Sequence, residues 1–177
     1  RDLYNLGYIE QNKLIEVSAK DLIGQYVGQT APKTMGVIEK ALGGVLFIDE
    51  AYSLASGAGS SGNSFNEEAI ATLIQAMENY RDNLVVIFAG YTKEMDAFLK
   101  SNSGIVSRIG YTMEFKDYTV DELIEIFKSM FKKAGFTVEK SAINKAKEIV
   151  EEYRHTEGFG NARFVRNLYE KAIIKIS

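Results

Sequence analysis

The chain is 177 residues long with 46% hydrophobic and 25% charged residues, which is enough for a core that makes one large domain, or one domain with a small appendage. A formal net charge of -3 gives no basic field for gripping a nucleic acid, and no apolar run approaches the ~20 residues that span a bilayer, so neither nucleic acid nor a membrane is an expected partner. Cysteine is absent and His155 is the single histidine, which excludes cysteine ligands and a histidine metal cluster; a cysteine-free chain also fits a reducing compartment, and we expect a cytoplasmic protein.

Strands and helices alternate in the first part of the chain. Apolar spacing and turn residues predict, in chain order, a helix end at 1–8, a strand at 13–18, a helix ending near 42, a strand at 44–49, a helix at 65–80, a strand at 84–90, a short helix at 94–100 and a strand at 111–115. The runs at 44–49 and 84–90 are continuously apolar, which is typical of parallel strands covered on both faces. The alternation predicts right-handed crossovers and an α/β fold with a parallel sheet.

The character of the chain changes after Asp117. No further strand is predicted, and three amphipathic helices follow, the first of which begins with a capping-box pattern from Thr119 to Glu122. We therefore expect two parts, an α/β core at 1–116 and a small all-helical part at 117–177.

The run GVLFIDE at 44–50 places two carboxylates, Asp49 and Glu50, at the end of a buried strand. Open α/β sheets bind ligands at the carboxyl ends of their strands, so this is the position of an active site. Adjacent acids suit a metal-assisted phosphoryl transfer, in which one acid holds Mg²⁺ and the next polarises the attacking water. The alternative is structural: Asp49 caps the following helix or pairs with a base.

Four motifs occur in order along nearly the whole chain: YVGQTAPKTMGVIEKALGGVLFIDEAYSL, VIFAGYTKEMD, GIVSRIGYTMEF and GFGNARFVRNL. Together they closely resemble the AAA+ ATPases, and more narrowly the group that contains the sporulation protein SpoVK and the red-type Rubisco activase CbbX, with the mycobacterial secretion ATPase EccA as a relative. The resemblance implies a P-loop NTPase-like parallel sheet with helices on both faces, followed by a small all-helical lid. It also implies ATP and Mg²⁺ as cofactors.

The resemblance gives roles to several charged residues. VLFIDE is similar to the Walker B strand, with Asp49 on Mg²⁺ and Glu50 activating water. Arg108 in GIVSRI stands where an arginine finger reaches a neighbouring subunit, a role that suits a planar, always charged guanidinium. A surface ion pair is the alternative for Arg108. Arg163 in GNAR stands at the sensor 2 position, which contacts the bound nucleotide, and Arg166 is its rival.

Two aromatic motifs receive roles in the same way. The sensor 1 position falls near Tyr91 in FAGYT, where many AAA+ proteins have Asn, so Tyr91 or Thr92 is expected to orient the water. QYVGQT resembles the pore loop that grips a threaded polypeptide, with Tyr26 and Val27 lining the channel and Gly28 giving the loop freedom to move. Packing of Tyr26 against its own loop is the alternative. The stretch ASGAGSSGNS is either a second pore loop or a plain connection.

One motif of the family is missing, because no Gly-Lys-Ser or Gly-Lys-Thr occurs in the sequence. In relatives the phosphate-cradling loop G-x-x-x-x-G-K-[S/T] and its strand lie just upstream of the helix that residues 1–8 finish. We therefore expect a fragment cut inside the ATPase domain, which alone binds ATP weakly or not at all. We expect the gap in the sheet to be closed by direct pairing of 84–90 with 111–115, by swapping with another copy, or by leaving the last strand detached.

The function implied by the resemblance is that of a ring-forming ATPase. The parent protein would hydrolyse ATP with Mg²⁺ between subunits of a homo-oligomeric ring, expected to be a hexamer, and would act as a chaperone that remodels or threads a protein partner. A Rubisco, a sporulation factor and a secretion substrate all fit this description. The alternatives are a degenerate, non-hydrolysing AAA+-like scaffold or interaction module, and a nucleic-acid motor, which the acidic balance disfavours.

Overall fold

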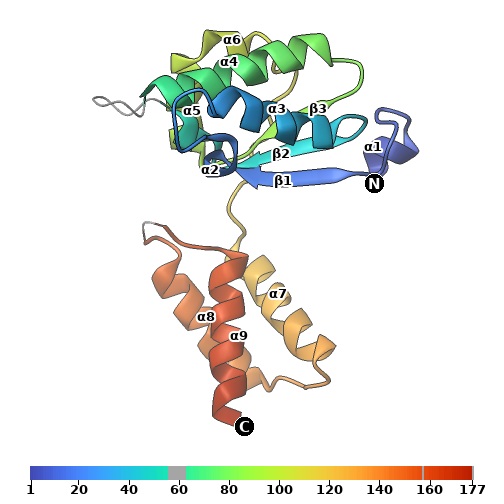
Figure 1. Ribbon diagram of the computed structural model, residues 1–177. Helices are drawn as coiled ribbons and strands as arrows, with labels where there is room; N and C mark the ends of the chain where they lie inside the picture. Colours follow the sequence, from blue (N-terminus) through green and yellow to red (C-terminus); the bar gives the residue numbers. More distant parts are fainter. Residues whose placement is uncertain (56–62, 157, 177) are drawn as a thin grey trace. The chain divides into compact units, whose positions relative to one another are not determined.

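The computed structural model describes residues 1–55, 63–156 and 158–176 of the chain (Figure 1). Clustering of contacts divides the chain into two compact units, Arg1–Met113 and Glu114–Ser177. Each unit has a hydrophobic core of its own. The first unit combines strands and helices, and the described part of the second is helical apart from its connections.

The first unit is built around a parallel sheet. In chain order it contains α1 (Asp2–Asn5), β1 (Leu14–Ser18), α2 (Ala19–Leu22), α3 (Thr30–Ala41), β2 (Val45–Asp49), the 3-10 helix η1 (Ala51–Leu54), α4 (Asn63–Asn79), β3 (Val85–Phe88), α5 (Thr92–Ser101) and α6 (Ser103–Val106). The strands are hydrogen-bonded in the order β1–β2–β3, with Ile15, Leu46 and Val86 in one row. The predicted parallel α/β sheet is therefore confirmed, and β2 is its central strand.

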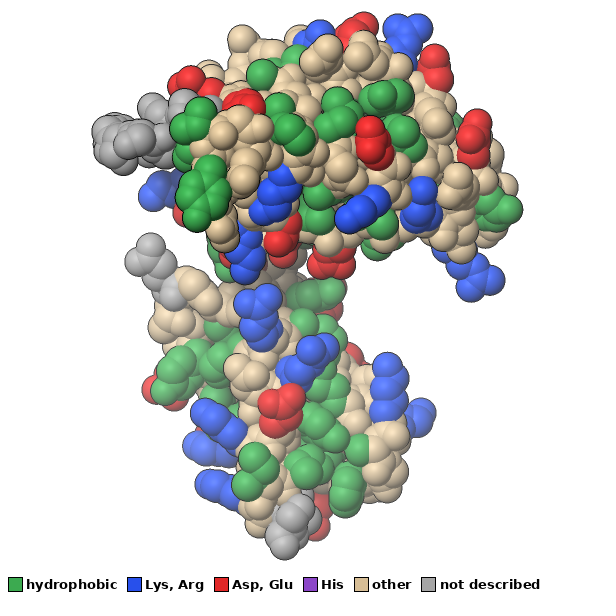
Figure 2. Space-filling view, in the orientation of Figure 1, with side chains coloured by type: hydrophobic (Ala, Val, Ile, Leu, Met, Phe, Trp, Pro, Cys, Tyr) green, Lys and Arg blue, Asp and Glu red, His purple; other side chains and the backbone are tan. Residues whose placement is uncertain are grey.

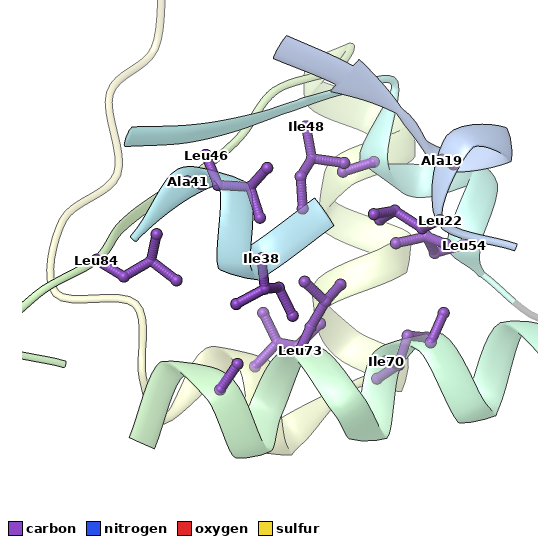
Figure 3. Packing of buried hydrophobic residues seen from close by; sticks show 14 of the residues in the cluster. Ala19, Leu22, Ile38, Ala41, Leu46, Ile48, Leu54, Ile70, Leu73 and Leu84 are labelled. Atoms are coloured by element: carbon purple, nitrogen blue, oxygen red, sulfur yellow. The ribbon is translucent and has the colours of Figure 1, made fainter. Parts of the chain in front are cut away.

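One face of the sheet packs against helices α3 and α4 (Figure 3). Leu46 and Ile48 of β2 meet Ile38 of α3 and Leu73 of α4, and all four side chains are fully buried. Burying an aliphatic side chain of this size stabilises a fold by about 1.5–3 kcal/mol. This packing fixes the position of β2 and of the residues that follow it.

The opposite face of the sheet is only partly covered within the described residues. Val45 of β2 is buried there, but Leu14 of β1 is 60% exposed and Ile87 of β3 is exposed as well. Side chains alternate between the two faces of a strand, so these residues point away from the side that carries Leu46. The continuous apolar runs thus give the sheet two apolar faces, and α3 and α4 cover the face that carries Leu46 and Ile48.

The predicted strand at 111–115 is wrong. Residues 110–119 form neither helix nor strand, and the side chains of Tyr111, Met113 and Phe115 are exposed, that of Phe115 by 85%. The alternation of apolar residues is typical of a strand, but a strand also needs a hydrogen-bonding neighbour, and no described segment pairs with the outer edge of β3. Of the three expected ways to close the sheet, the structure shows the detached last segment.

Short helices account for most other differences from the prediction. The helix α2 follows β1 directly, where no separate helix was predicted. It begins with a reciprocal capping box in which the Asp21 carboxylate accepts bonds from the Ser18 N–H at 2.8 Å and the Ser18 hydroxyl at 2.7 Å. These hydrogen bonds from Ser18 hold the pKa of Asp21 below its ordinary value. A helix of four residues is too short to show an apolar period, which is why α2, η1 and α6 were not expected.

The second unit contains α7 (Val120–Lys133), α8 (Lys140–Tyr153) and α9 (Ala162–Ile176), which confirms the three predicted helices. The predicted capping box is also present: the Glu122 carboxylate accepts a 2.8 Å bond from the Thr119 N–H, and the Thr119 hydroxyl accepts a 3.3 Å bond from the Glu122 N–H. Leu123, Val150 and Val165 contribute one buried side chain from each helix to the core. Over both units, none of the helices within the described ranges is long and apolar enough to cross a membrane.

Candidate functional site

The two predicted acids lie at the carboxyl end of β2. Asp49 is the last residue of β2, Glu50 follows it, and both side chains are exposed. Asp49 Oδ1 accepts a 2.9 Å hydrogen bond from the Glu50 N–H. No side chain caps η1, and Asp49 forms no salt bridge within the described residues, so neither structural alternative for Asp49 is observed there.

Glu50 has a left-handed backbone conformation, with φ 49° and ψ 42°. For a residue with a Cβ atom this costs roughly 1–2 kcal/mol, and such conformations are concentrated at functional sites. The backbone on its C-terminal side is tied down: the Ala51 N–H donates to the Ala89 carbonyl at 3.0 Å, and the Ser53 N–H donates to the Glu50 carbonyl at 2.8 Å. Ala51 and Leu54 are fully buried. The fold therefore positions Glu50 without using its carboxylate.

Two tyrosines lie beside these acids. The ring centroids of Tyr52 and Tyr91 are 6.3 Å apart. Gly90 permits this approach, because a Cβ atom at that position would lie only 2.7 Å from Tyr52 Cδ1. Burial raises the pKa of Tyr52 above its ordinary value, and the charge of Glu50 raises it further. The Tyr52 phenol therefore stays protonated at neutral pH, and the structure brings the predicted Tyr91 into the surroundings of Glu50.

The sequence argument missed two residues of this cluster, Tyr52 and Glu94. Glu94 and Asp49 both contribute to the raised pKa of Tyr52, which places all three in one electrostatic environment. Glu94 lies in the first turn of α5, and Tyr52 lies within η1. Since β2 and β3 are parallel neighbours, the residues that follow them meet at one edge of the sheet. A comparison of the segments after each predicted strand could have found both residues.

This edge suits one magnesium ion bound together with a ligand. In the described parts of the chain, no three Asp, Glu, His or Cys side chains are arranged to hold a metal ion. Mg²⁺ keeps several waters and usually takes one or two carboxylates plus substrate phosphates, a requirement that Asp49 can meet with Oδ2. A shallow concavity beside Asp49 is lined by Glu16, Val17, Ser18 and Asp21. Its acidic lining favours a cation over a free phosphate.

Arg108 follows α6 and is bonded within its own unit. Its Nη2 atom lies 3.2 Å from Oε2 of Glu78, and its Nη1 atom donates to the Gly104 carbonyl at 3.0 Å. The Nε atom is buried and has no partner within the described residues. The ion pair that was the alternative for Arg108 is thus present. A role in a neighbouring subunit would require the pair with Glu78 to open.

Arg163 and Arg166 belong to α9 in the second unit. Both side chains are exposed, whereas Val165 between them is fully buried in the core. Within the described residues neither guanidinium forms an ion pair or a hydrogen bond. Arg163 lies in the first turn of α9, and Arg166 lies about one turn further on. Both residues therefore remain candidates for the sensor 2 role.

The predicted pore loop has an exposed tip. Tyr26 is 68% exposed and Val27 is 89% exposed, so Tyr26 does not pack away against its own loop. Gly28 has a φ of 81°, a conformation that glycine adopts at no steric cost. An aromatic and an aliphatic side chain are thus presented next to each other in solvent.

The base of the same loop is fixed by two fully buried threonines. Thr30 Oγ1 accepts a 3.0 Å hydrogen bond from the Gly24 N–H, and the Thr34 hydroxyl donates to the Leu22 carbonyl at 2.9 Å. Buried hydrogen bonds of this kind are costly to break, so the ends of the loop are held firmly. The possible second pore loop falls largely on residues 56–62, which lie outside the described residues.

Comparison with protein families agrees with this architecture. The family described as "ATPase family associated with various cellular activities (AAA)" matches residues 6–117, and the AAA lid domain matches residues 119–177. The two matches occur in the same order as the two units: the ATPase family matches the α/β unit that presents acids after its central strand, and the lid family matches the helical unit. The chain therefore belongs to the AAA family of ATPases, and the resemblance to that family is confirmed.

Curated relatives narrow the family further. The protein CfxQ of Xanthobacter flavus is 45% identical over 99% of this chain, and CbbX of Cereibacter sphaeroides is 42% identical over 98%. The chloroplastic ribulose bisphosphate carboxylase/oxygenase activase of Cyanidioschyzon merolae is 44% identical over 98% of this chain. The chain spans 55–58% of the length of these three relatives. The predicted likeness to CbbX is thus confirmed, and the likeness to SpoVK and EccA stays a prediction.

Proposed function

We propose that the chain is part of an AAA+ ATPase that couples Mg-ATP hydrolysis to the remodelling of a protein partner in the cytoplasm. The observation that carries the proposal is Glu50, an exposed acid held in a left-handed conformation directly after Asp49 at the end of the central strand. A turn with only a structural role would use Gly or Asn at lower cost. A base that activates water has to be an ionisable group.

The proposed mechanism divides the work among the residues of the site. Bound Mg-ATP supplies the phosphoryl group and the metal charge that neutralises it. Asp49 would hold the magnesium ion through a carboxylate oxygen, and Glu50 would accept the proton of the attacking water. Tyr91 or Thr92 orients that water through a hydroxyl group. Arg163 contacts the nucleotide, and Arg166 takes this role if Arg163 does not.

The substitution Glu50→Gln in the full-length protein tests the mechanism. Because an amide keeps the shape of the side chain but cannot accept the proton, we expect ATP binding to persist while turnover falls by about 10²–10⁴-fold. Nucleotide binding and phosphate release measure the two steps separately. Glu39→Gln, a change of an exposed acid on α3, is the matched control and should leave turnover unchanged. Undiminished turnover in Glu50→Gln would remove Glu50 from the mechanism.

The chain by itself should bind ATP weakly or not at all. It contains no Gly-Lys-Ser or Gly-Lys-Thr, so it lacks the motif whose backbone amides and lysine hold the phosphates. The concavity beside Asp49 is acidic and would repel them. Isothermal titration of the chain with Mg-ATP should give no measurable heat at micromolar ligand. Micromolar affinity would mean that another part of the chain binds phosphate.

The proposal includes a ring and a polypeptide substrate. If Arg108 acts in trans, each interface is head-to-tail and heterologous, an arrangement that forms a ring when its rotation closes, and we propose a hexamer. Tyr26 and Val27 are exposed enough to grip a chain that passes through such a ring. One relative is named an activase of ribulose bisphosphate carboxylase/oxygenase, so that carboxylase is the first partner to test. A role in sporulation has no support beyond the original resemblance.

A non-hydrolysing scaffold is the second candidate function, and the lack of a Gly-Lys-Ser/Thr motif is the observation that favours it. The presence of Asp49, Glu50 and Arg108 together disfavours it, because a scaffold needs none of these charges at these places. A nucleic-acid motor is disfavoured by the net charge of -3, and on the face drawn in Figure 2 basic and acidic side chains are interspersed over the first unit. An ATPase assay of the full-length protein separates the scaffold from the enzyme.

A further inference from the structure

Asn161 joins two segments of the second unit that are far apart in sequence. Its Nδ2 atom donates a 2.7 Å hydrogen bond to Oδ1 of Asp117, and its Oδ1 atom accepts a 3.1 Å bond from the backbone N–H of Tyr118. The nitrogen and the oxygen of one carboxamide therefore both form hydrogen bonds to the segment that connects the first unit to α7. We call these two hydrogen bonds the Asn161 clamp.

The clamp lies where two helices begin. Tyr118 directly precedes Thr119, the N-cap of α7, and Asn161 directly precedes Ala162, the first residue of α9. Arg163 is in the first turn of α9, two residues beyond the clamp. The segment at Asp117 is therefore tied to the backbone that carries Arg163 by two hydrogen bonds, in addition to the core of the unit.

The backbone of Asn161 limits which residue can form the clamp. Its φ is 47°, in the left-handed region, and among the described non-glycine residues Glu50 is the other with a positive φ. Asparagine enters this region more readily than most residues, and glycine would fit the backbone but lacks the carboxamide. Aspartate would fit the space but would place a second carboxylate against Asp117. Asparagine meets both requirements.

We propose that Asn161 is a positioning residue that fixes Arg163 relative to the segment Asp117–Tyr118. The Asn161 clamp makes the orientation of Arg163 depend on the direction from which the chain enters the helical unit. This inference rests on the proposed function, since it requires that Arg163 contacts the nucleotide.

The clamp itself is tested in the present chain by exchanging its two polar groups. Asn161→Asp should weaken it, because two carboxylates would then face each other. The double change Asn161→Asp with Asp117→Asn should restore it, because donor and acceptor are exchanged. Denaturant unfolding of the four proteins in this cycle should show that the double variant is more stable than the sum of the single changes predicts. Strict additivity of the single changes would overturn the clamp.

The functional part is tested by ATPase kinetics of the full-length protein. We expect Asn161→Asp to raise the KM for ATP by about fivefold with a smaller change in kcat, and the double variant to recover the KM of the wild type. Asn144→Asp adds the same charge to an exposed position of α8 and should leave both constants unchanged. A variant that is merely less stable would lose active protein, which lowers the apparent kcat and leaves the KM for ATP unchanged.

The variant Arg163→Ala separates failure of this inference from failure of the proposed function. If Arg163→Ala raises KM but Asn161→Asp does not, Arg163 contacts the nucleotide and the positioning role of Asn161 is wrong. If neither variant changes KM, the sensor 2 role of Arg163 is wrong, and the inference about its positioning falls with it. A rise in KM for Asn161→Asp that the double variant does not reverse also contradicts the clamp.

Discussion

At the scale of single residues, Glu50 and Asn161 share a backbone conformation but use it differently. Their φ angles are 49° and 47°. The Asn161 side chain makes two hydrogen bonds, whereas the Glu50 carboxylate makes none within the described residues. For Asn161, local strain is offset by contacts in the same unit. For Glu50, the strain is offset by hydrogen bonds of the backbone and by the buried residues that follow it, while the carboxylate stays free of contacts within the described residues, as expected for a group kept for a ligand.

This contrast predicts that substitution by glycine changes the free energy of unfolding differently at the two positions. Because glycine relieves the left-handed strain and Glu50 has no side-chain contact to lose, Glu50→Gly should raise the free energy of unfolding by about 0.5–1 kcal/mol. Asn161→Gly relieves a similar strain but removes two hydrogen bonds, so it should give no gain. Denaturant unfolding of the chain measures both variants. A loss of stability in Glu50→Gly would show that its carboxylate has a structural partner.

At the scale of elements, the capping box of α7 links stability to pH. Hydrogen bonds from the Thr119 backbone and hydroxyl hold the pKa of Glu122 below its ordinary value. A carboxyl group whose pKa is lower in the folded state adds stability above its unfolded-state pKa, and loses that contribution as the pH falls through its folded-state pKa. The start of α7 should therefore weaken on acidification below the ordinary range of a glutamate.

Two variants measure this effect. Thr119→Ala should lower the free energy of unfolding at pH 7 by about 1 kcal/mol, because it removes an N-cap. Glu122→Gln should flatten the part of the stability profile that lies below the ordinary pKa of glutamate. Thermal unfolding followed by circular dichroism across acidic pH records both. An unchanged acid profile in Glu122→Gln would mean that other carboxylates dominate this range.

Elements specified by local patterns could be predicted from the sequence, and those specified by distant partners could not. The strands β2 and β3 and the capping box at Thr119 follow from apolar runs and from residues a few positions apart. The segment 111–115 has the alternation of a strand, but the partner that would make it one is not encoded in its own residues. Pattern alone could not show this difference.

The candidate site divides in the same way. Asp49 and Glu50 were predicted because they directly follow a buried strand. Tyr52 and Glu94 were missed because only the parallel pairing of β2 with β3 brings η1 and α5 together. The ion pair of Arg108 with Glu78, whose charged atoms are 3.2 Å apart, joins the end of α4 to the residues after α6. No spacing in the sequence indicates that these two segments meet.

At the scale of the whole molecule, the described residues leave the outer edge of β3 unpaired and apolar side chains exposed at 111–115. Such features favour association between copies, because free backbone groups and apolar side chains are both satisfied by a second chain. We expect the isolated chain to self-associate as its concentration rises. Phe115→Lys should reduce association, and Thr112→Lys, at an exposed polar position nearby, should reduce it less. Sedimentation velocity measures this, and a chain that stays monomeric at all concentrations contradicts it.

The predicted pore loop is firmly attached at its base. The Tyr26 side chain at its tip is exposed, and the loop meets the fold at Gly24 and Thr30, which are hydrogen-bonded to each other in a buried environment. A Cβ atom at Gly24 would lie 2.9 Å from the backbone N of Thr30, so the two ends of the loop are in close contact. A pull on Tyr26 therefore cannot be absorbed by stretching the base. The force is transmitted directly to the start of α3, because the two ends of the loop are held together at Gly24 and Thr30.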